Sequence, residues 1–398
     1  MQQYLRMVKR RFWLRALERS WARRSVIWLR GVRRAGKTML ARSLPKNRYF
    51  DCELPSVRRQ LEDPEAFWDQ HRGQTVVLDE AHRLRHPSEV LKIAADRYPG
   101  TKVLATGSSL LGASARFRDT LAGRKADVWL TPMNLQDLAD FPGRSLDRRL
   151  LHGGLPGFYL SDPVPVSDFQ EWMDAYWAKD IQELFRLERR YSFQRFAELL
   201  FTQSGGLFEA SRFAAPCEVS RTTITNYLAV LEATLAVHVI RPFSTRRAVE
   251  IVAAPKVYGF DTGFVCFHRG WERLRQDDYG ILWEHFVLNE LHSRLPGPEL
   301  RYWRDKQKHE IDFIWSRARE PAPAAIECKW SPDNFDPANL RVFRRHYPQG
   351  ENFVVCPNVA ESYTRSYRGL VVRFCNPDGL VRRLGTGQAG RRSTPIAS

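Results

Sequence analysis

Long apolar runs are absent from this sequence of 398 residues. No segment approaches the roughly 20 consecutive apolar residues that span a bilayer, and the first twenty residues are basic without an uninterrupted apolar core. We therefore expect no membrane anchor and no export signal. No internal repeat is visible either. The length instead predicts two or three domains, each able to bury a core of its own.

Cysteine is sparse and scattered along the chain. The six cysteines stand far apart and form no CxxC pair, which argues against a cysteine zinc site or a dithiol redox site. Unpaired cysteines in a long chain are typical of a reducing compartment. We therefore expect a cytoplasmic protein.

The positive charge of the chain is concentrated at its two ends. The net charge is +17, yet residues 1–48 hold fifteen Lys and Arg against Glu18 alone, and residues 381–398 hold four Arg and no acid. The long stretch between these ends is close to neutral. Basic ends can attract the phosphates of DNA or RNA. A solvated basic helix and a disordered tail, which we expect over residues 386–398, explain the same charges without a nucleic acid.

A phosphate-binding pattern follows the first apolar strand. SVIWLRG predicts a buried strand that ends at a glycine, and GVRRAGKT completes a GxxxxGK[ST] pattern. Glycines let the backbone approach phosphates, the lysine reaches the β- and γ-phosphates, and the threonine hydroxyl binds Mg²⁺. A glycine-rich turn that matches by chance is disfavoured by the strand before it and the helix after it. We expect ATP and Mg²⁺ to be held by loop residues Gly31, Arg33, Gly36, Lys37 and Thr38.

Two later apolar strands end in acid and hydroxyl side chains. TVVLDE ends in Asp79, which can hold Mg²⁺ through water, and Glu80, which can orient the attacking water. TGSS ends the next strand, so Thr106 or Ser108 is a candidate nucleotide sensor, although both residue types are common in turns. Arg124 in LAGRK is a candidate finger that acts on the nucleotide of a neighbouring subunit in a homo-oligomer, although most surface arginines are simply solvated.

Changes in composition predict a multi-domain α/β protein. Strands that alternate with helical segments predict a parallel sheet over residues 1–145. Residues 146–250 follow a loop-rich boundary and show helical spacing, and residues 251–385 return to mixed α/β sequence. We expect these three segments to be separate domains.

The middle segment has the pattern of a helix-turn-helix. LFEASRFAAPCEVSRTTITNYLAVLEATLAVHVI predicts a short helix, a turn near Pro216, a second helix and the start of a wing. Arg221, Thr222, Thr223 and Asn226 stand where a recognition helix contacts bases or phosphates. A winged helix in an ATPase also serves as a packing or lever module, so contact with DNA is one of two interpretations.

Two strands near the carboxyl end carry acids among apolar residues. In HEIDFIW, Glu310 and Asp312 share a face, and in AAIECKW, Glu327 and Lys329 share a face. The Pro-rich segment between them suits a hairpin connection. Buried carboxylates need cations or an open cleft. Hard oxygen ligands select Mg²⁺ or Mn²⁺, which can activate a water; a solvent-facing hairpin with an ordinary Glu–Lys pair is the alternative.

The spacing D-x14-E-x-K resembles the core of the PD-(D/E)xK nuclease superfamily, and so does the helix GILWEHFVLNELHSRL upstream. The resemblance implies that Asp312 and Glu327 hold the metal and that Lys329 polarises or positions the water. It also implies that Glu284 or Glu290 completes the site. A fold can persist as a binding module without catalysis, so cleavage does not follow from the fold alone.

The order of the motifs resembles a widespread prokaryotic family of AAA+-like ATPases with a C-terminal domain of unknown function. The matching pieces are GVRRAGKT, VVLDE, LATGSS, LAGRK, GGLPGF, the Lys179-Asp180-Ile181 step, APKVYGFDTGF, LWEHFVLNEL, HEIDFIW and IECKW. The resemblance implies an N-terminal P-loop ATPase, a helical and winged-helix middle and a nuclease-like end. At the positions of Arg34 and Ala35, members of this family usually have a neutral polar residue followed by Val. We expect this difference not to disturb phosphate binding.

These observations favour an ATP-hydrolysing protein that acts on DNA and carries a metal-dependent nuclease-like domain. A regulatory switch whose C-terminal domain only binds a partner is an alternative of a different class. A translocase or helicase without cleavage is a third interpretation.

Overall fold

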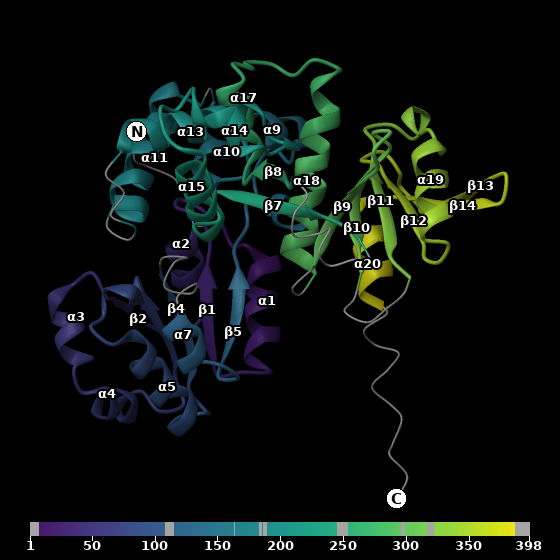
Figure 1. Cartoon of the computed structure of the whole chain (residues 1–398). Helices are drawn as coiled ribbons and strands as arrows, with labels where there is room; N and C mark the ends of the chain where they lie inside the picture. The colour runs from purple at the N-terminus through teal and green to yellow at the C-terminus, as the bar shows by residue number, and fades with distance from the viewer. Residues whose placement is uncertain are drawn as a thin grey trace, which may run out of the picture. The chain divides into compact units, whose positions relative to one another are not determined.

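The computed structural model describes residues 8–107, 115–162, 164–182, 185, 189–244, 254–295, 299–316 and 322–386. These residues pack as two compact units, which we call the first unit (residues 1–195 and 222–236) and the second unit (residues 196–221 and 237–398). Figure 1 shows the order of their elements along the chain. The three-domain division expected from the sequence remains a prediction.

A sheet of five parallel strands forms the centre of the first unit, in the order β2-β3-β4-β1-β5. The strands are β1 (Val26–Arg30), β2 (Asn47–Asp51), β3 (Thr75–Asp79), β4 (Lys102–Thr106) and β5 (Lys125–Trp129). The sheet confirms the predicted strands at β1, β3 and β4. The sequence analysis did not predict β2 and β5, which lie at the two edges, because edge strands bury only part of their surface and both are rich in polar residues.

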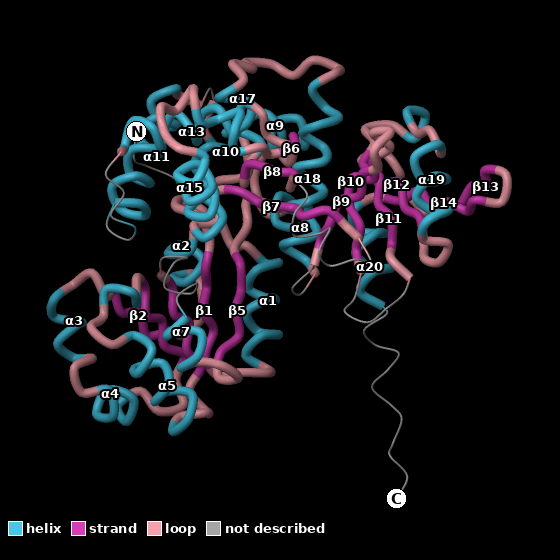
Figure 2. Tube along the Cα trace, in the orientation of Figure 1, coloured by secondary structure: helices cyan, strands magenta, loops and turns pink. Residues whose placement is uncertain are grey.

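Helices of the first unit cover this sheet and continue beyond it, as the cyan segments of Figure 2 show. Around the sheet lie α1 (Arg11–Trp21), α2 (Lys37–Arg42), α3 (Pro55–Gln60), α4 (Pro64–Gln70), η1 (Ala81–Arg83), α5 (Pro87–Arg97) and α7 (Ala115–Thr120). The later helices are α8 (Leu135–Leu138), α9 (Leu146–His152), α10 (Pro156–Leu160), α11 (Val166–Tyr176), the π-helical η2 (Trp177–Gln182), the start of α13 (Arg190–Thr202) and α15 (Arg221–Ala233).

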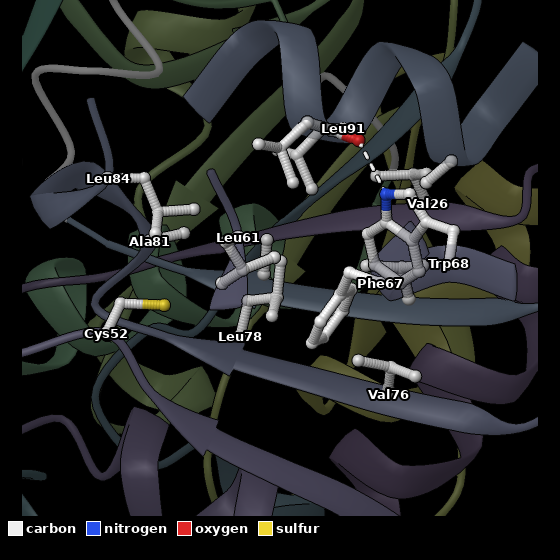
Figure 3. Packing of buried hydrophobic residues seen from close by; sticks show 14 of the residues in the cluster. Val26, Cys52, Leu61, Phe67, Trp68, Val76, Leu78, Ala81, Leu84 and Leu91 are labelled. Atoms are coloured by element: carbon white, nitrogen blue, oxygen red, sulfur yellow. Dashed lines mark hydrogen bonds between the residues drawn. The ribbon is translucent and has the colours of Figure 1, made fainter. Parts of the chain in front are cut away.

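One face of the five-stranded sheet forms a hydrophobic core with α3, α4, α5 and α7 (Figure 3). Alternate strand residues point into it, as the two-residue period of a strand requires: Val26 and Trp28 in β1, and Val76 and Leu78 in β3. The buried Trp68 of α4 packs in this core and donates its indole N–H to the Val90 carbonyl at 3.0 Å. This packing fixes the strand ends from which the site residues project.

The second unit contains a mixed sheet of nine strands in the order β13-β14-β12-β11-β10-β9-β7-β8-β6. Its strands are β6 (Gly206–Leu207), β7 (Val237–Pro242), β8 (Lys256–Gly259), β9 (Leu300–Arg304), β10 (Glu310–Trp315), β11 (Ala324–Cys328), β12 (Asn352–Val355), β13 (Tyr363–Tyr367) and β14 (Leu370–Cys375). β10 and β11 pair antiparallel, with Phe313 opposite Ile326, which confirms the predicted pairing. Residues 317–321 of the predicted hairpin connection lie outside the described residues.

The helices of the second unit are α14 (Ala210–Ala214), α17 (Thr262–His268), α18 (Asp278–Arg294), η3 (Pro332–Asn334), α19 (Ala338–His346), α20 (Pro377–Thr386) and the end of α13. α18 is buried on most of its surface, and its Trp283 donates an indole N–H to the Val355 carbonyl of β12 at 2.8 Å. All six cysteines are buried free thiols. Within the described ranges, no helix has the length and apolar character needed to span a membrane.

Candidate functional site

The loop between β1 and α2 has the backbone geometry of a phosphate cradle. Gly36 adopts φ +93°, a left-handed conformation that glycine accepts without strain. A Cβ at Gly31 would lie 2.5 Å from the backbone oxygen of Leu130, so the close approach of the loop to the chain after β5 requires glycine there. The loop residues Gly31, Arg33, Gly36, Lys37 and Thr38 all line one cavity of about 510 Å³. The structure therefore brings together the predicted phosphate-binding residues.

The Lys37 side chain lies within the loop. Its ammonium donates to the backbone oxygens of Gly31 at 2.8 Å and Val32 at 3.2 Å. Burial lowers the pKa of Lys37, and the negative charges of Glu80 and Asp180 oppose that shift. An ammonium held by neutral carbonyls is ready to exchange them for phosphate oxygens, which are charged and bind it more strongly.

Asp79 ends β3 and is buried. Its carboxylate accepts hydrogen bonds from the Tyr49 hydroxyl at 2.5 Å and from the Thr106 hydroxyl of β4. Burial raises the pKa of Tyr49, and its hydrogen bond to Asp79 raises it further, so this phenol stays a donor. The Thr106 hydroxyl also accepts the backbone N–H of Glu80 at 3.0 Å. Thr106 therefore holds the Asp79 carboxylate and the backbone of Glu80, a role that was not predicted from the sequence.

Glu80 directly follows β3 and has φ +53°. This left-handed conformation is strained for a residue other than glycine, and such strained residues are concentrated at functional sites. His82 Nδ1 lies 3.2 Å from the Glu80 carboxylate. Burial alone would raise the pKa of Glu80, but the His82 hydrogen bond and the positive charge of Lys37 lower it. Glu80 is therefore ionised near neutral pH, as a residue that orients an attacking water must be.

The segment before α1 supports the phosphate loop from behind. The buried Arg10 donates through Nη1 to the Ala35 carbonyl at 2.7 Å and through Nε to the carboxylate of Asp137 at 3.0 Å. Asp137 also accepts the Trp13 indole N–H at 3.0 Å. Arg10, one of the basic residues near the amino terminus, is thus buried and paired inside the protein. Sequence reasoning missed it because the partners are 127 residues apart.

Helical segments of the first unit close the other side of the cavity. Arg33 pairs with Asp180 of η2, Nε to Oδ2 at 2.9 Å, and the Trp172 indole donates to the Arg33 carbonyl at 3.0 Å. Asp180 and its neighbour Lys179 both line the cavity. Single turns of π-helix are often found at functional sites. Two residues of the Lys179-Asp180-Ile181 step therefore line the candidate nucleotide cavity.

Asp180→Asn is expected to tighten ATP binding about five-fold, because it removes a carboxylate that opposes the phosphates and releases the Arg33 guanidinium, a change of ~1 kcal/mol. Titration with a fluorescent ATP analogue measures the change in Kd. Glu171→Gln is the matched control, since Glu171 does not line the cavity and its ion pair with Arg34 at 3.2 Å is exposed to solvent, so Kd should change by less than about two-fold. Weaker binding by Asp180→Asn would show instead that the Arg33–Asp180 pair shapes the loop for the nucleotide.

Several predicted residues of the nucleotide site do not line the cavity. Asp79 and Thr106 are buried and are not among its lining residues. Ser108 lies outside the described residues. Arg124 pairs with Asp96, Nε to Oδ1 at 2.7 Å, and does not line the cavity. Its action on a neighbouring subunit stays a prediction.

In the second unit, a buried lysine lies among the acids that the sequence singled out. The Lys256 ammonium of β8 is 2.9 Å from Glu284 Oε1 of α18 and 2.7 Å from Glu310 Oε1 of β10. The Tyr258 hydroxyl donates to the same oxygen of Glu284. Burial alone would lower the pKa of Lys256, but the neighbouring carboxylates outweigh it and raise the pKa. In the sequence, Lys256 stands alone in the apolar run APKVYGF. A charged residue in such a run could have indicated a buried ion pair, but it was not used as a prediction.

The other acids gather at the end of β11. Glu327 accepts from the Lys329 ammonium at 2.8 Å through Oε2, while its Oε1 is buried without a hydrogen-bond partner. Asp312 Oδ2 accepts the Cys328 backbone N–H at 2.7 Å and lies 3.9 Å from the Lys329 nitrogen. Burial raises the pKa of Glu327 to about 8, with a further contribution from the charge of Asp312. The predicted trio Asp312, Glu327 and Lys329 is therefore brought together.

The two predicted candidates on α18 are in different environments. Glu284 contacts Lys256 and Tyr258, and burial followed by the charge of Asp312 raises its pKa, while Lys256 opposes this shift. Glu290 pairs instead with Arg294 at 3.1 Å. Among the residues that the structure describes, no three His, Cys, Asp or Glu side chains form a group that could hold a metal ion. A third carboxylate ligand beside Asp312 and Glu327 therefore remains a prediction.

Comparisons with known proteins match three consecutive segments of the chain. The family described as an AAA domain matches residues 23–139, and two families described as domains of unknown function, DUF8612 and DUF4143, match residues 143–275 and 279–372. A Walker-type ATPase of Pyrococcus abyssi resembles the structure with a TM-score of 0.43 and 17% identity, over 66% of this chain and 96% of the other.

Two mycobacterial proteins are similar over most of the chain. They are uncharacterized proteins of Mycobacterium bovis and Mycobacterium tuberculosis, each 30% identical over 327 residues, which is 79% of this chain and 73% of the relative. The AAA domain covers the five-stranded sheet and the loop between β1 and α2, and its residues Lys37 and Glu80 line the cavity. The chain belongs to the family of AAA+-like P-loop ATPases that carry a C-terminal DUF4143 domain.

Proposed function

We propose that this ATPase acts on DNA and that its second unit is a metal-dependent nuclease-like domain. The observation that carries the proposal is the buried oxygen Oε1 of Glu327, which has no hydrogen-bond partner although it lies beside Asp312 and Lys329. An unpaired carboxylate oxygen in the interior is costly unless a cation or a donor reaches it. A divalent cation meets this requirement.

The donor set fits Mg²⁺ or Mn²⁺. Mg²⁺ is bound in proteins through one or two carboxylates and keeps several waters, which matches the pair Asp312 and Glu327. When bound, the ion would supply a water of lowered pKa close to the DNA phosphate. Lys329, held between the two carboxylates, would orient that water and offset negative charge.

Residues of the first unit would bind ATP and hydrolyse it. Lys37 would contact the β- and γ-phosphates, and Thr38 and Asp79 would hold Mg²⁺. Glu80, ionised and fixed by His82, would orient the attacking water. Arg33 would approach the phosphates once its pairing with Asp180 gives way.

DNA contact is proposed through the winged-helix pattern and the basic ends. In the second unit, β7 and β6 each pair antiparallel with β8, as the strands of a wing do. α15 begins at Arg221, and Thr222 and Asn226 near its start are exposed. Exposed polar residues in the first turns of such a helix can contact bases or phosphates. We infer a cytoplasmic setting, where DNA is accessible.

Asp312→Asn is expected to lower Mg²⁺- or Mn²⁺-dependent DNA cleavage by at least about 100-fold, because one of two metal ligands loses its charge. ATP hydrolysis should be unchanged. Gel assays on linear and circular DNA, run beside a phosphate-release assay, measure both activities. Asp333→Asn, on an exposed aspartate of the neighbouring turn η3, is the control. Wild-type protein that cuts no DNA or RNA under any metal condition contradicts the nuclease proposal.

A regulatory switch is the second candidate. It is favoured by two lysine side chains that already lie among the carboxylates of Glu284, Glu310, Asp312 and Glu327, which we call the acid cluster. Lys256 and Lys329 each pair with carboxylates, as expected of a domain that binds a partner without catalysis. ATP-dependent partner binding with no cleavage by the wild type is the result that this candidate predicts. A translocase would instead show DNA-stimulated ATP hydrolysis that disappears in Lys37→Ala.

A further inference from the structure

Lys256 lies between two carboxylates of the second unit. Its ammonium touches Glu284 from α18 at 2.9 Å and Glu310 from β10 at 2.7 Å, and its side chain is only 6% exposed. Arg304 pairs with the second oxygen of Glu310 at 3.1 Å. These two carboxylates are therefore already neutralised by cations of the protein itself.

Oε1 of Glu284 accepts a second hydrogen bond as well. The oxygen that Lys256 contacts also accepts the hydroxyl of the buried Tyr258. A metal ion bound to Glu284 would have to compete with these two donors and would lie next to a positive charge. No comparable donor reaches Oε1 of Glu327, the one oxygen of the acid cluster that is buried and unpartnered among the described residues.

We propose that Lys256 is a built-in cation that takes the place of a second metal ion, so that the acid cluster binds a single divalent cation at Asp312 and Glu327 and Glu284 is a positioning residue for Lys256. The inference rests on the proposed nuclease-like function and makes it more specific. It differs from the expectation, drawn from the resemblance, that Glu284 or Glu290 completes the metal site. It also predicts that the acid cluster works with one metal ion, while Lys256 stays paired with Glu284 and Glu310.

Counting bound Mn²⁺ by electron paramagnetic resonance on the nucleotide-free whole chain tests the inference. We expect one Mn²⁺ per chain in the wild type. Glu284→Gln, which keeps the shape and an acceptor for Lys256, should bind one Mn²⁺ with Kd changed by less than about five-fold. Glu327→Gln should lose at least about 100-fold in affinity, since a direct ligand matters more than the outer partners. Asp312→Asn provides the blank for any Mn²⁺ bound elsewhere.

Lys256→Met extends the count, because removal of the ammonium should open a second site and give two Mn²⁺ per chain. If this variant does not fold, the comparison of Glu284→Gln with Glu327→Gln decides. After subtraction of the Asp312→Asn blank, two Mn²⁺ in the wild type, a loss in Glu284→Gln equal to that in Glu327→Gln, or one Mn²⁺ in folded Lys256→Met overturns the inference and leaves the nuclease proposal intact. A wild type that binds no Mn²⁺ overturns both.

Discussion

Glu80→Gln is expected to lower the rate of ATP hydrolysis by about 10² to 10³-fold while nucleotide binding persists. The amide keeps the size of the side chain and loses the charge that orients the attacking water. Glu80 is ionised in the structure because His82 and Lys37 stabilise its charge. Lys37→Ala should lose both binding and hydrolysis, because its ammonium is the phosphate contact. Phosphate release and equilibrium binding of ATP, measured on both variants, separate the two roles.

The matched control for Glu80→Gln is Glu53→Gln, the same change in an exposed carboxylate that lines the same cavity. Glu53 contacts neither Lys37 nor Asp79 among the hydrogen bonds and ion pairs of the described residues, so hydrolysis should stay within about two-fold. Equal losses in both variants would mean that the net charge of the cavity, rather than the position of Glu80, controls turnover.

Arg10→Met is expected to lower the free energy of unfolding of the first unit by about 3–5 kcal/mol, because it leaves the charge of Asp137 buried without its cation. Arg10 and Asp137 have side chains that are 4% and 0% exposed. For a unit of this size the loss corresponds to a Tm about 10 °C lower. Calorimetry or thermal melting followed by circular dichroism measures it.

Arg11→Met is the matched control, one residue along the chain. Arg11 is 72% exposed and pairs with Asp140 at 3.1 Å, so its loss should cost about 0–1 kcal/mol. The double variant Arg10→Met/Asp137→Leu should recover much of the stability, since apolar side chains can replace a buried pair. We expect both Arg10→Met and the double variant to bind ATP more weakly than the wild type, because both lack the hydrogen bond from Arg10 to the Ala35 carbonyl of the phosphate loop. Recovery of both properties would assign Arg10 to stability alone.

Local patterns were sufficient to predict the centre of the first unit. β1, β3 and β4 are apolar runs buried on both faces. Lys37 begins the helix after β1, Asp79 ends β3, and Glu80 follows it. β2 and β5 escaped prediction because an edge strand is held by one neighbour and tolerates polar residues. The helix α18 and the strands β10 and β11 were also predictable, because each contains enough apolar residues in its local sequence to mark a helix or a strand.

Contacts between distant residues were not predictable from local sequence. Arg10 with Asp137, and Arg33 with Asp180, are separated by 127 and 147 residues and depend on how helices pack against the phosphate loop. Lys256 was visible in the sequence as a lysine in an apolar strand, but only the fold shows that it lies between Glu284 and Glu310. Sequence motifs therefore indicated the reacting groups, and tertiary packing determined their partners.

The most direct test of the account is the release of phosphate from γ-labelled ATP in the presence of Mg²⁺, by the wild type and by Lys37→Ala under identical conditions. The account predicts turnover by the wild type that requires Mg²⁺ and falls to background in the variant. A wild type that neither binds nor hydrolyses any nucleoside triphosphate, or a Lys37→Ala variant as active as the wild type, contradicts it.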